Sequence, residues 1–276
     1  MAEPKTKVVT LLNQKGGVNK STIAMNSAAV VAEKLTEDLP DDAPSPVALV
    51  SVDPQGSAKW WADRIGPSAL PFHLIQADDD PLEWLRQMNA IEGISHLFVD
   101  TPGWHDTTTD PSIDGLGDSY TADVLRTVLD VSDEFIVPME AAPLCFDPTA
   151  RTIEKLIVPR GKRFTVVVSN FDARNGGKRL AKTRDFALKR GWPIADTVLR
   201  RYSVHTDASA DRLLVPEYKQ LVSAAQLQNY HNVRAELWTT PDRERRSAIE
   251  KDLPPELKAA DDFYRLVDEL DLAGAA

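Results

Sequence analysis

Two lysines, two glycines and two hydroxyl residues fall within one short stretch of the chain, residues 15–22, which reads KGGVNKST. An apolar run rich in β-branched residues precedes it at 7–12, and apolar residues recur at helical spacing after it, from Ile23 to Leu35. A strand, a glycine-rich loop and a helix form a phosphate-binding site, because glycines let backbone N–H groups turn toward an anion and the helix adds the positive end of its dipole. We therefore predict that these residues bind a nucleotide: Gly16, Gly17, Val18, Asn19, Lys20, Ser21 and Thr22.

Two side chains of the loop are placed for phosphate chemistry. Lys20 can reach the β- and γ-phosphates of a nucleotide, and the hydroxyl of Ser21 can ligate Mg²⁺. An ordinary glycine-rich turn is the alternative interpretation, but a turn alone does not explain why two lysines and a Ser-Thr pair stand at these positions.

Two aspartates, Asp53 and Asp100, stand at the ends of apolar runs that predict buried strands, at 47–52 and 96–100. The carboxyl ends of parallel strands meet at one edge of a sheet, so both acids are expected beside the phosphate loop. A carboxylate in that position can organise Mg²⁺ in phosphate-loop proteins. Either acid alone could equally be a turn or helix-capping residue. The Asp-, Thr- and Gly-rich segment 104–118 predicts either a nucleotide-sensing switch loop or an ordinary flexible loop.

Strands and helices alternate along the chain, which predicts an α/β fold with a doubly wound, mainly parallel sheet flanked by helices. Strands are expected at about 7–12, 47–52, 72–75, 96–100, 135–138, 164–169 and 194–199. Helices are expected at about 20–38, around Trp60, and at 81–90, 119–131, 147–157, 176–190, 217–238, 241–251 and 256–271. We predict one domain over residues 1–276, with its core at about 7–216 and extra C-terminal helices at about 217–276.

Composition narrows the class of protein. The chain of 276 residues has no apolar run near the roughly 20 residues that span a bilayer, and its first residues show no secretory signal. Cys145 is the only cysteine, so no internal disulfide is expected, and the five histidines show no metal-ligand spacing. We expect a cytoplasmic protein in a reducing compartment.

Charge is unevenly distributed along the chain. The net charge of −10 argues against a general polyanion binder, but residues 160–201 hold twelve Lys or Arg and only three acids. This asymmetry predicts a basic face on an acidic body, with a merely solvated helix face as the alternative.

The phosphate loop, the segment VDPQG at 52–56 and the segment DTPG at 100–103 resemble, in order and spacing, the deviant Walker A ATPases of the ParA/MinD family. The resemblance covers about residues 7–216. It is closest to the small ParA-type partition ATPases, since no DNA-binding extension precedes the first strand. Two positions depart from the family: Asn19 stands where glycine is usual, which bears on nucleotide affinity, and Ser57 stands where asparagine is common.

The resemblance implies a role for each motif residue. Lys15 would cross a dimer interface to phosphates held by the partner subunit, Lys20 would bind its own subunit's phosphates, and Asp53 would position or activate the attacking water. Ser21 and Asp100, the latter through water, would hold Mg²⁺. The expected cofactors are therefore ATP or ADP with Mg²⁺. The expected unit is a homodimer that ATP holds together and slow hydrolysis dissolves.

The base pocket is expected beside the end of strand 164–169. Related proteins place an asparagine against adenine, and Asn170 is the candidate here, with Pro216 in the loop 215–217 on the other side. A turn-forming asparagine is the alternative interpretation of Asn170.

The resemblance further implies an ATP-dependent DNA segregation ATPase. Its ATP-bound dimer would bind double-stranded DNA without sequence preference, at the nucleoid, and a ParB-like centromere-binding protein would stimulate hydrolysis. Five residues of the basic stretch are candidate phosphate contacts: Lys178, Arg179, Lys182, Arg200 and Arg201. The alternative is a ParA-like positioning ATPase whose cargo is a protein assembly or a transfer complex, because cargo choice lies in the partner protein.

Three other classes match less well. A MinD-like membrane switch needs a basic amphipathic terminal helix, whereas residues 268–276 are acidic and then small, so no membrane partner is expected. An iron–sulfur reductase of this fold needs paired cysteines, whereas this chain has Cys145 alone. Metabolic ligases of the dethiobiotin synthetase kind lack the early lysine that stands here at Lys15.

Overall fold

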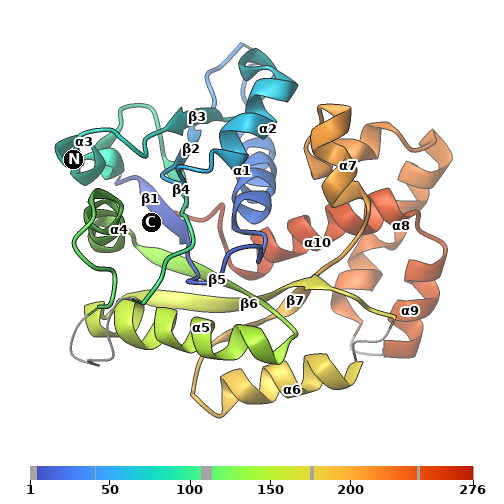
Figure 1. Cartoon of the computed structure of the whole chain (residues 1–276). Helices are drawn as coiled ribbons and strands as arrows, with labels where there is room; N and C mark the ends of the chain where they lie inside the picture. Colours follow the sequence, from blue (N-terminus) through green and yellow to red (C-terminus); the bar gives the residue numbers. More distant parts are fainter. Residues whose placement is uncertain (1–4, 41, 107–113, 175–176, 241–242, 276) are drawn as a thin grey trace.

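The computed structural model describes residues 5–40, 42–106, 114–174, 177–240 and 243–275. Within them, seven strands form one sheet in the order β3-β2-β4-β1-β5-β6-β7, and every neighbouring pair is parallel (Figure 1). The strands are β1 Lys7–Leu11, β2 Val47–Ser51, β3 His73–Gln76, β4 His96–Asp100, β5 Glu134–Glu140, β6 Arg163–Phe171 and β7 Ile194–Arg200. The predicted fold class is confirmed.

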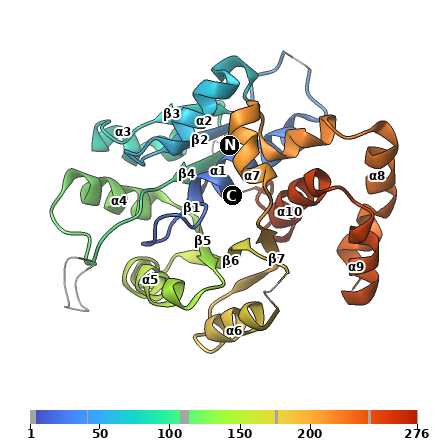
Figure 2. The ribbon, with the colours of Figure 1, turned by 45° about the vertical axis from the view of Figure 1, so that its right-hand side comes forward.

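Helices cover both faces of the sheet (Figures 1 and 2). Alternate residues of the strands point to opposite faces, so Val9 and Phe98 pack with α1, α2, α7 and α10, while Val8 and Val99 pack on the side of α3 and α4. The helices are α1 Lys20–Thr36, α2 Ser57–Ile65, α3 Leu82–Arg86, α4 Tyr120–Val131, α5 Phe146–Arg151, α6 Gly177–Leu188, α7 Val204–Asp211, α8 Ala224–Thr239, α9 Arg243–Lys251 and α10 Pro255–Glu269. Strands β1, β2 and β4 are buried at every residue, as expected for a parallel sheet covered on both sides.

The register of the central strands brings the predicted site residues to one edge. Asp100, the last residue of β4, lies beside Leu11 at the end of β1 and beside Ser51 at the end of β2. The phosphate loop therefore leaves β1, and Asp53 follows β2, at the same edge where β4 presents Asp100.

Three predicted helices are divided in the structure. The segment expected as one helix at 147–157 is α5 followed by a π-helical turn, Thr152–Ile157. The segment expected at 81–90 is α3 and a separate 3₁₀ turn, Met88–Ala90. The segment expected at 217–238 begins as the 3₁₀ turn Val215–Gln220 and restarts at α8, because Ser223 and Gln226 form a capping box.

The C-terminal helix α10 joins the sheet through an ion pair. Asp262 is buried on α10 and accepts hydrogen bonds from both the backbone N–H and the guanidinium of Arg200 at the end of β7. Glu250 on α9 pairs with the same guanidinium at 2.9 Å. Of the helices in the described parts of the chain, none is long and apolar enough to cross a membrane.

Candidate nucleotide-binding site

The phosphate loop turns through two residues with positive φ. Gly17 has a φ of 75° and Asn19 a φ of 67°, and α1 begins directly after Asn19. Asparagine enters this left-handed region more readily than other residues with a Cβ. Asn19 therefore keeps the backbone path that glycine would allow.

A cleft of about 610 Å³ opens between the phosphate loop and the ends of β2 and β4. Most predicted loop residues line it together with Asp53. Its lining residues are Gly16, Gly17, Asn19, Lys20, Ser21, Thr22, Asp53, Pro54, Gln55, Ser57, Pro102, Gly103 and Thr121. Sequence reasoning missed Thr121, on α4, because no motif marks it. Pro54, Gln55, Pro102 and Gly103 belonged to the recognised motifs but were given no role.

Lys20 lies buried at the base of this cleft. Its Nζ donates hydrogen bonds to the carbonyls of Asn13 and Lys15, at 3.3 and 3.2 Å. Burial lowers its pKa, and the nearby carboxylates of Asp100 and Asp53 oppose that shift. The ammonium is thus held by loop carbonyls where phosphate oxygens can replace them.

Asp100 fits a divalent cation. It is fully buried, and neither carboxylate oxygen has a hydrogen-bond partner of normal geometry among the described residues. Burial raises its pKa to about 7, while the neighbouring Ser21 hydroxyl and Lys20 oppose the shift. A buried carboxylate left in this state costs free energy that a hydrated Mg²⁺ would offset. The pair of Ser21 and Asp100 therefore suits Mg²⁺ held with nucleotide phosphates, although Asp100 does not itself line the cleft.

Asp53 faces the cleft from a turn after β2. Its Oδ1 accepts the backbone N–H of Gln55 at 2.9 Å, and its carbonyl accepts the amide of Gln76 at 3.1 Å. These bonds fix the carboxylate across the cleft from the loop, a position suited to orienting a water molecule.

Lys15 does not line the cleft. Its side chain is half-buried, and its positive charge acts on the Cys145 thiol, whose pKa burial raises and Lys15 lowers in part. Of the two lysines, only Lys20 lines the cleft, whereas the charge of Lys15 acts on Cys145 in the segment that follows β5.

Gly103 lets the loop after β4 approach the phosphate loop. A Cβ at this position would lie 3.0 Å from the carbonyl oxygen of Gln14 and 3.3 Å from the nitrogen of Gly16. The next residue, Trp104, donates its backbone N–H to that same carbonyl at 3.1 Å. The predicted switch segment continues from here, and its residues 107–113 lie outside the described residues.

The predicted base-pocket residues flank the loop without lining the cleft. Asn170 has a positive φ of 52° and donates to Glu140 at 2.6 Å, while the preceding Ser169 donates to the carbonyl of Val18 at 3.0 Å. Pro216 is buried, and its neighbour Val215 donates to Asn26 on α1 at 2.7 Å. Adenine contact by Asn170 and Pro216 stays a prediction.

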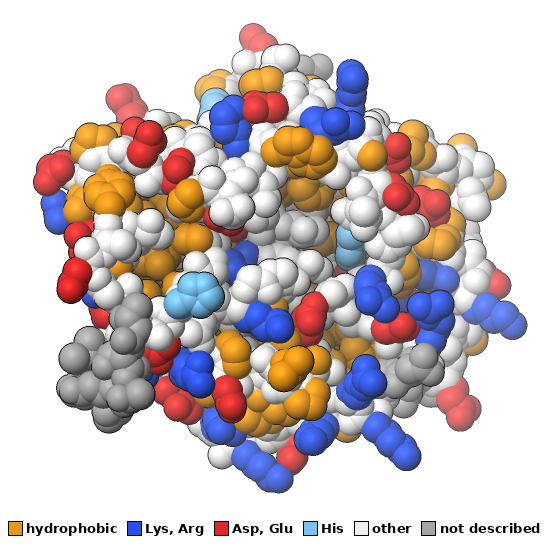
Figure 3. All heavy atoms as spheres, viewed as in Figure 1, with side chains coloured by type: hydrophobic (Ala, Val, Ile, Leu, Met, Phe, Trp, Pro, Cys, Tyr) orange, Lys and Arg blue, Asp and Glu red, His pale blue; other side chains and the backbone are white. Residues whose placement is uncertain are grey.

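The basic residues separate into two groups. Lys178, Arg179 and Lys182 are exposed on α6, and none of them forms an ion pair with an acid in the described parts of the chain. Lys and Arg side chains lie along the lower part of the face that Figure 3 shows. Arg201 is exposed and pairs with Asp172 at 3.2 Å.

Arg200 was wrongly grouped with these surface residues. Its side chain is only 15% exposed and is engaged by Asp262 and Glu250. A guanidinium held in this way cannot reach a DNA phosphate, and Arg200 is instead a structural residue that joins β7 to α10 and α9.

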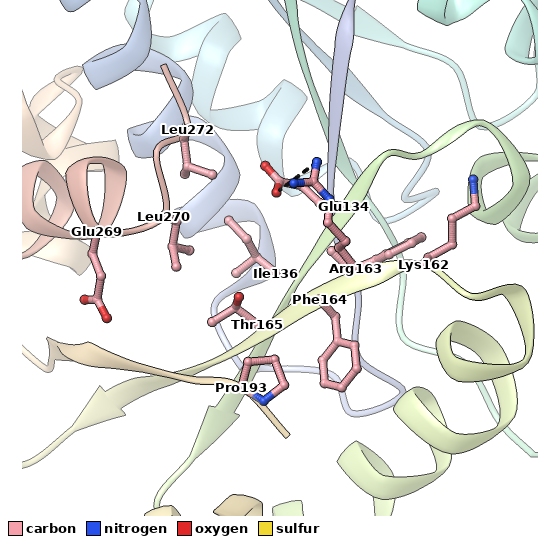
Figure 4. A pocket seen from close by; sticks show the side chains of 11 residues that line it. Glu134, Ile136, Lys162, Arg163, Phe164, Thr165, Pro193, Glu269, Leu270 and Leu272 are labelled. Atoms are coloured by element: carbon pink, nitrogen blue, oxygen red, sulfur yellow. Dashed lines mark ion pairs between the residues drawn. The ribbon is translucent and has the colours of Figure 1, made fainter. Parts of the chain in front are cut away.

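A second groove, of about 480 Å³, lies at the opposite edge of the sheet, by the amino ends of β5 and β6 (Figure 4). Its charged groups have partners: Glu134 pairs with Lys7 and Arg163, and Glu269 accepts the backbone N–H groups of residues 196 and 197. Lys162 donates to carbonyls of residues 130 and 132. This groove offers no phosphate chemistry, so the cleft beside the loop is the candidate nucleotide site.

Comparison with known proteins identifies the family of the chain. No protein-family profile matches the chain. The chain is 31% identical to "Maintenance of carboxysome distribution protein A" of Gloeobacter kilaueensis over 231 residues, 84% of this chain and 94% of that protein. It is 36% identical to the chromosome-partitioning ATPase Soj of Thermus thermophilus over 104 residues, 37% of this chain and 35% of that protein. The structure of a McdA–ATP complex from Cyanothece superposes with a TM-score of 0.56 at 11% identity, covering 96% of each chain, which shows the shared fold.

The parallel sheet, the loop with its lysine and the Asp53 and Asp100 carboxylates define a phosphate-loop ATPase. The chain belongs to the ParA/MinD family of deviant Walker A ATPases.

Proposed function

We propose that this ATPase is a nucleotide-switched positioning protein whose cargo is a protein assembly. The observation that carries this proposal is the similarity along 84% of the chain to a relative named for the distribution of carboxysomes. From the sequence alone, a protein assembly as cargo is the alternative to DNA segregation. The similarity to a chromosome-partitioning protein covers a much shorter part of the chain.

In the proposed switch, the two lysines would bind the phosphates of different ATP molecules. Lys20, in the cleft, would bear the charge that develops on the γ-phosphate of its own subunit's ATP, together with Mg²⁺ at Ser21 and Asp100. Mg²⁺, when bound, neutralises phosphate charge. Lys15 does not line the cleft of its own subunit and would instead contact the nucleotide of a second copy. ATP would then hold two copies face to face.

Hydrolysis would depend on Asp53. Its carboxylate, fixed by the Gln55 N–H, would accept a hydrogen bond from water and aim it at the γ-phosphate. Loss of the γ-phosphate removes the anion that Lys15 of the other copy contacts, so the dimer would separate.

The exposed cations of α6 would provide the contact with DNA. Lys178, Arg179 and Lys182 are not paired with acids in the described parts of the chain, and Arg201 lies at the end of the neighbouring strand β7. Pairing two copies doubles this charge, which suits non-specific contact with DNA phosphates despite the acidic composition. A partner protein bound to the cargo would stimulate hydrolysis and so move the cargo along the nucleoid.

The test has two parts. The purified chain should bind random-sequence duplex DNA with ATP, weakly or not at all with ADP, and less as salt increases. In cells that carry the gene, its deletion should cluster protein assemblies and leave plasmid and chromosome retention unchanged. Loss of plasmids or chromosomes with normally spaced assemblies would favour the DNA partition function instead. The similarity to Soj supports that second function.

A further inference from the structure

We propose that Thr149 and Thr152, on the segment after β5, are positioning residues for Lys15. The two hydroxyl groups hold the backbone of the phosphate loop just before that lysine. This role rests on the proposed function, in which Lys15 must reach the nucleotide of a second copy.

The first contact runs through Asn13, which is fully buried. Its amide nitrogen donates to Thr149 Oγ1 at 2.9 Å and to the carbonyl of Pro138 at 2.7 Å. Its amide oxygen accepts the backbone N–H of Lys15 at 2.9 Å. The direction in which Lys15 leaves the loop is therefore coupled, through one side chain, to α5.

The second contact is direct. Thr152 Oγ1 accepts the backbone N–H of Gln14 at 2.8 Å and donates to the carbonyl of Pro148 at 2.9 Å. Thr152 begins the π-helical turn Thr152–Ile157, a local irregularity of a kind that is frequent at functional sites. Because Thr152 is fully buried, water cannot replace its hydroxyl without cost.

The carbonyl groups of the same segment are also engaged. Gln14 accepts the N–H of Trp104, and Asn13 and Lys15 accept the ammonium of Lys20. Hydrogen bonds thus tie residues 13–15 to the segment after β5, to the loop after β4 and to Lys20. The glycines that follow have no comparable side-chain hydrogen bonds among the described residues. Hydrogen bonds to the segment after β5 therefore set where Lys15 lies, whereas Lys20 is positioned from the start of α1.

The experiment compares Thr152→Val, which removes the hydroxyl at constant shape, with Thr152→Ser, which keeps it. Thr183→Val is the matched control: Thr183 is also fully buried and donates to a helix carbonyl, that of Arg179, at 2.9 Å, but it lies on α6. We expect Thr152→Val to bind ATP as the wild type does, to lose about 10–100-fold in kcat and to dimerise poorly with ATP. Thr152→Ser should restore kcat, and Thr183→Val should leave it unchanged.

Backbone amide exchange separates this inference from the proposed function. In Thr152→Val, the amide of Gln14 should exchange faster than in the wild type, whatever the wild-type protein binds or positions. Unchanged exchange at Gln14 and unchanged kcat would overturn the proposal, as would an equal fall in ATP affinity and kcat. Thr149→Val, with the amide of Lys15 as its readout, repeats the test at the other contact.

Discussion

The ammonium of Lys20 donates a hydrogen bond to the main-chain carbonyl of Lys15 at 3.2 Å, although only Lys20 faces the cleft. One lysine is therefore linked to the backbone of the other, while the Lys15 side chain does not line the subunit's own cleft. In the proposed function, each lysine would bind the phosphates of a different nucleotide.

Replacement of Asp53 should uncouple binding from hydrolysis. Asp53→Ala removes the carboxylate that would orient water and leaves Lys20, Ser21 and Asp100 in place, so ATP should bind and hold a dimer that does not turn over. Sedimentation with ATP and Mg²⁺ checks this. A variant that remains monomeric under those conditions would contradict the role given to Asp53.

Replacement of the exposed cations of α6 should weaken DNA binding alone. Lys178, Arg179 and Lys182 together changed to Ala remove six cations from each dimer, so ATP-dependent DNA affinity should fall at least tenfold and the slope of log affinity against log salt should decrease by up to about 5. Basal ATP hydrolysis should stay at the wild-type rate. An unchanged salt slope would make this face a solvated helix surface.

Arg200 should matter for stability and not for DNA. Arg200→Ala leaves the buried carboxylate of Asp262 without its partner, which costs about 3–5 kcal/mol in comparable buried pairs. Arg201→Ala, at an exposed neighbour, should cost less than about 1 kcal/mol. Urea unfolding of both variants gives the comparison, and similar losses in the two would refute the structural assignment of Arg200.

His205 should make the protein less stable in acid. Burial lowers its pKa to about 4, and its ring meets Tyr202 and Phe263 edge-on. Because the unfolded chain binds this proton first, near pH 6.5, the stabilisation is present above pH 6.5 and is lost as pH falls toward 4. His205→Phe should therefore reduce the fall in Tm between pH 7 and 4 by about 5–10 °C. The exposed His73, changed to Gln, is the control, and parallel Tm curves for His205→Phe and the wild type would contradict the assignment.

The sequence was sufficient for the parts of the site that lie on local motifs. Strand, loop and helix around residues 15–22 are adjacent in the chain, and parallel pairing brings Asp53 and Asp100 to the same edge, so pattern and topology predicted the cleft. Arg200 could not be assigned in this way, because its partners Asp262 and Glu250 lie 62 and 50 residues further on and no motif links them. A cation in a basic stretch has the same sequence signal whether it faces water or a buried acid.

The contacts that Thr149 and Thr152 make with the phosphate loop could not be predicted from the sequence for a similar reason. Thr149 and Thr152 lie more than 130 residues after the loop that they hold, as the separations of 136 and 138 residues show. Their pattern in the sequence is that of any helix. The π-helical turn and the division of the segment 217–238 likewise depend on tertiary contacts and local capping that periodicity alone does not report.

The most direct test of the central claim is to mix two inactive variants. Lys15→Gln should bind ATP but lack the lysine that serves a second copy, and Asp53→Ala should bind ATP but lack the water-orienting carboxylate. In a mixed dimer, Asp53→Ala would supply Lys15 to the site of the Lys15→Gln subunit, whose own Asp53 is intact. An equimolar mixture should then regain ATP hydrolysis, up to roughly a quarter of the wild-type rate if the subunits pair at random, since about half of such dimers are mixed and each has one complete site. A mixture as inactive as its components, with mixed dimers shown to be present, would show that Lys15 does not act across the interface.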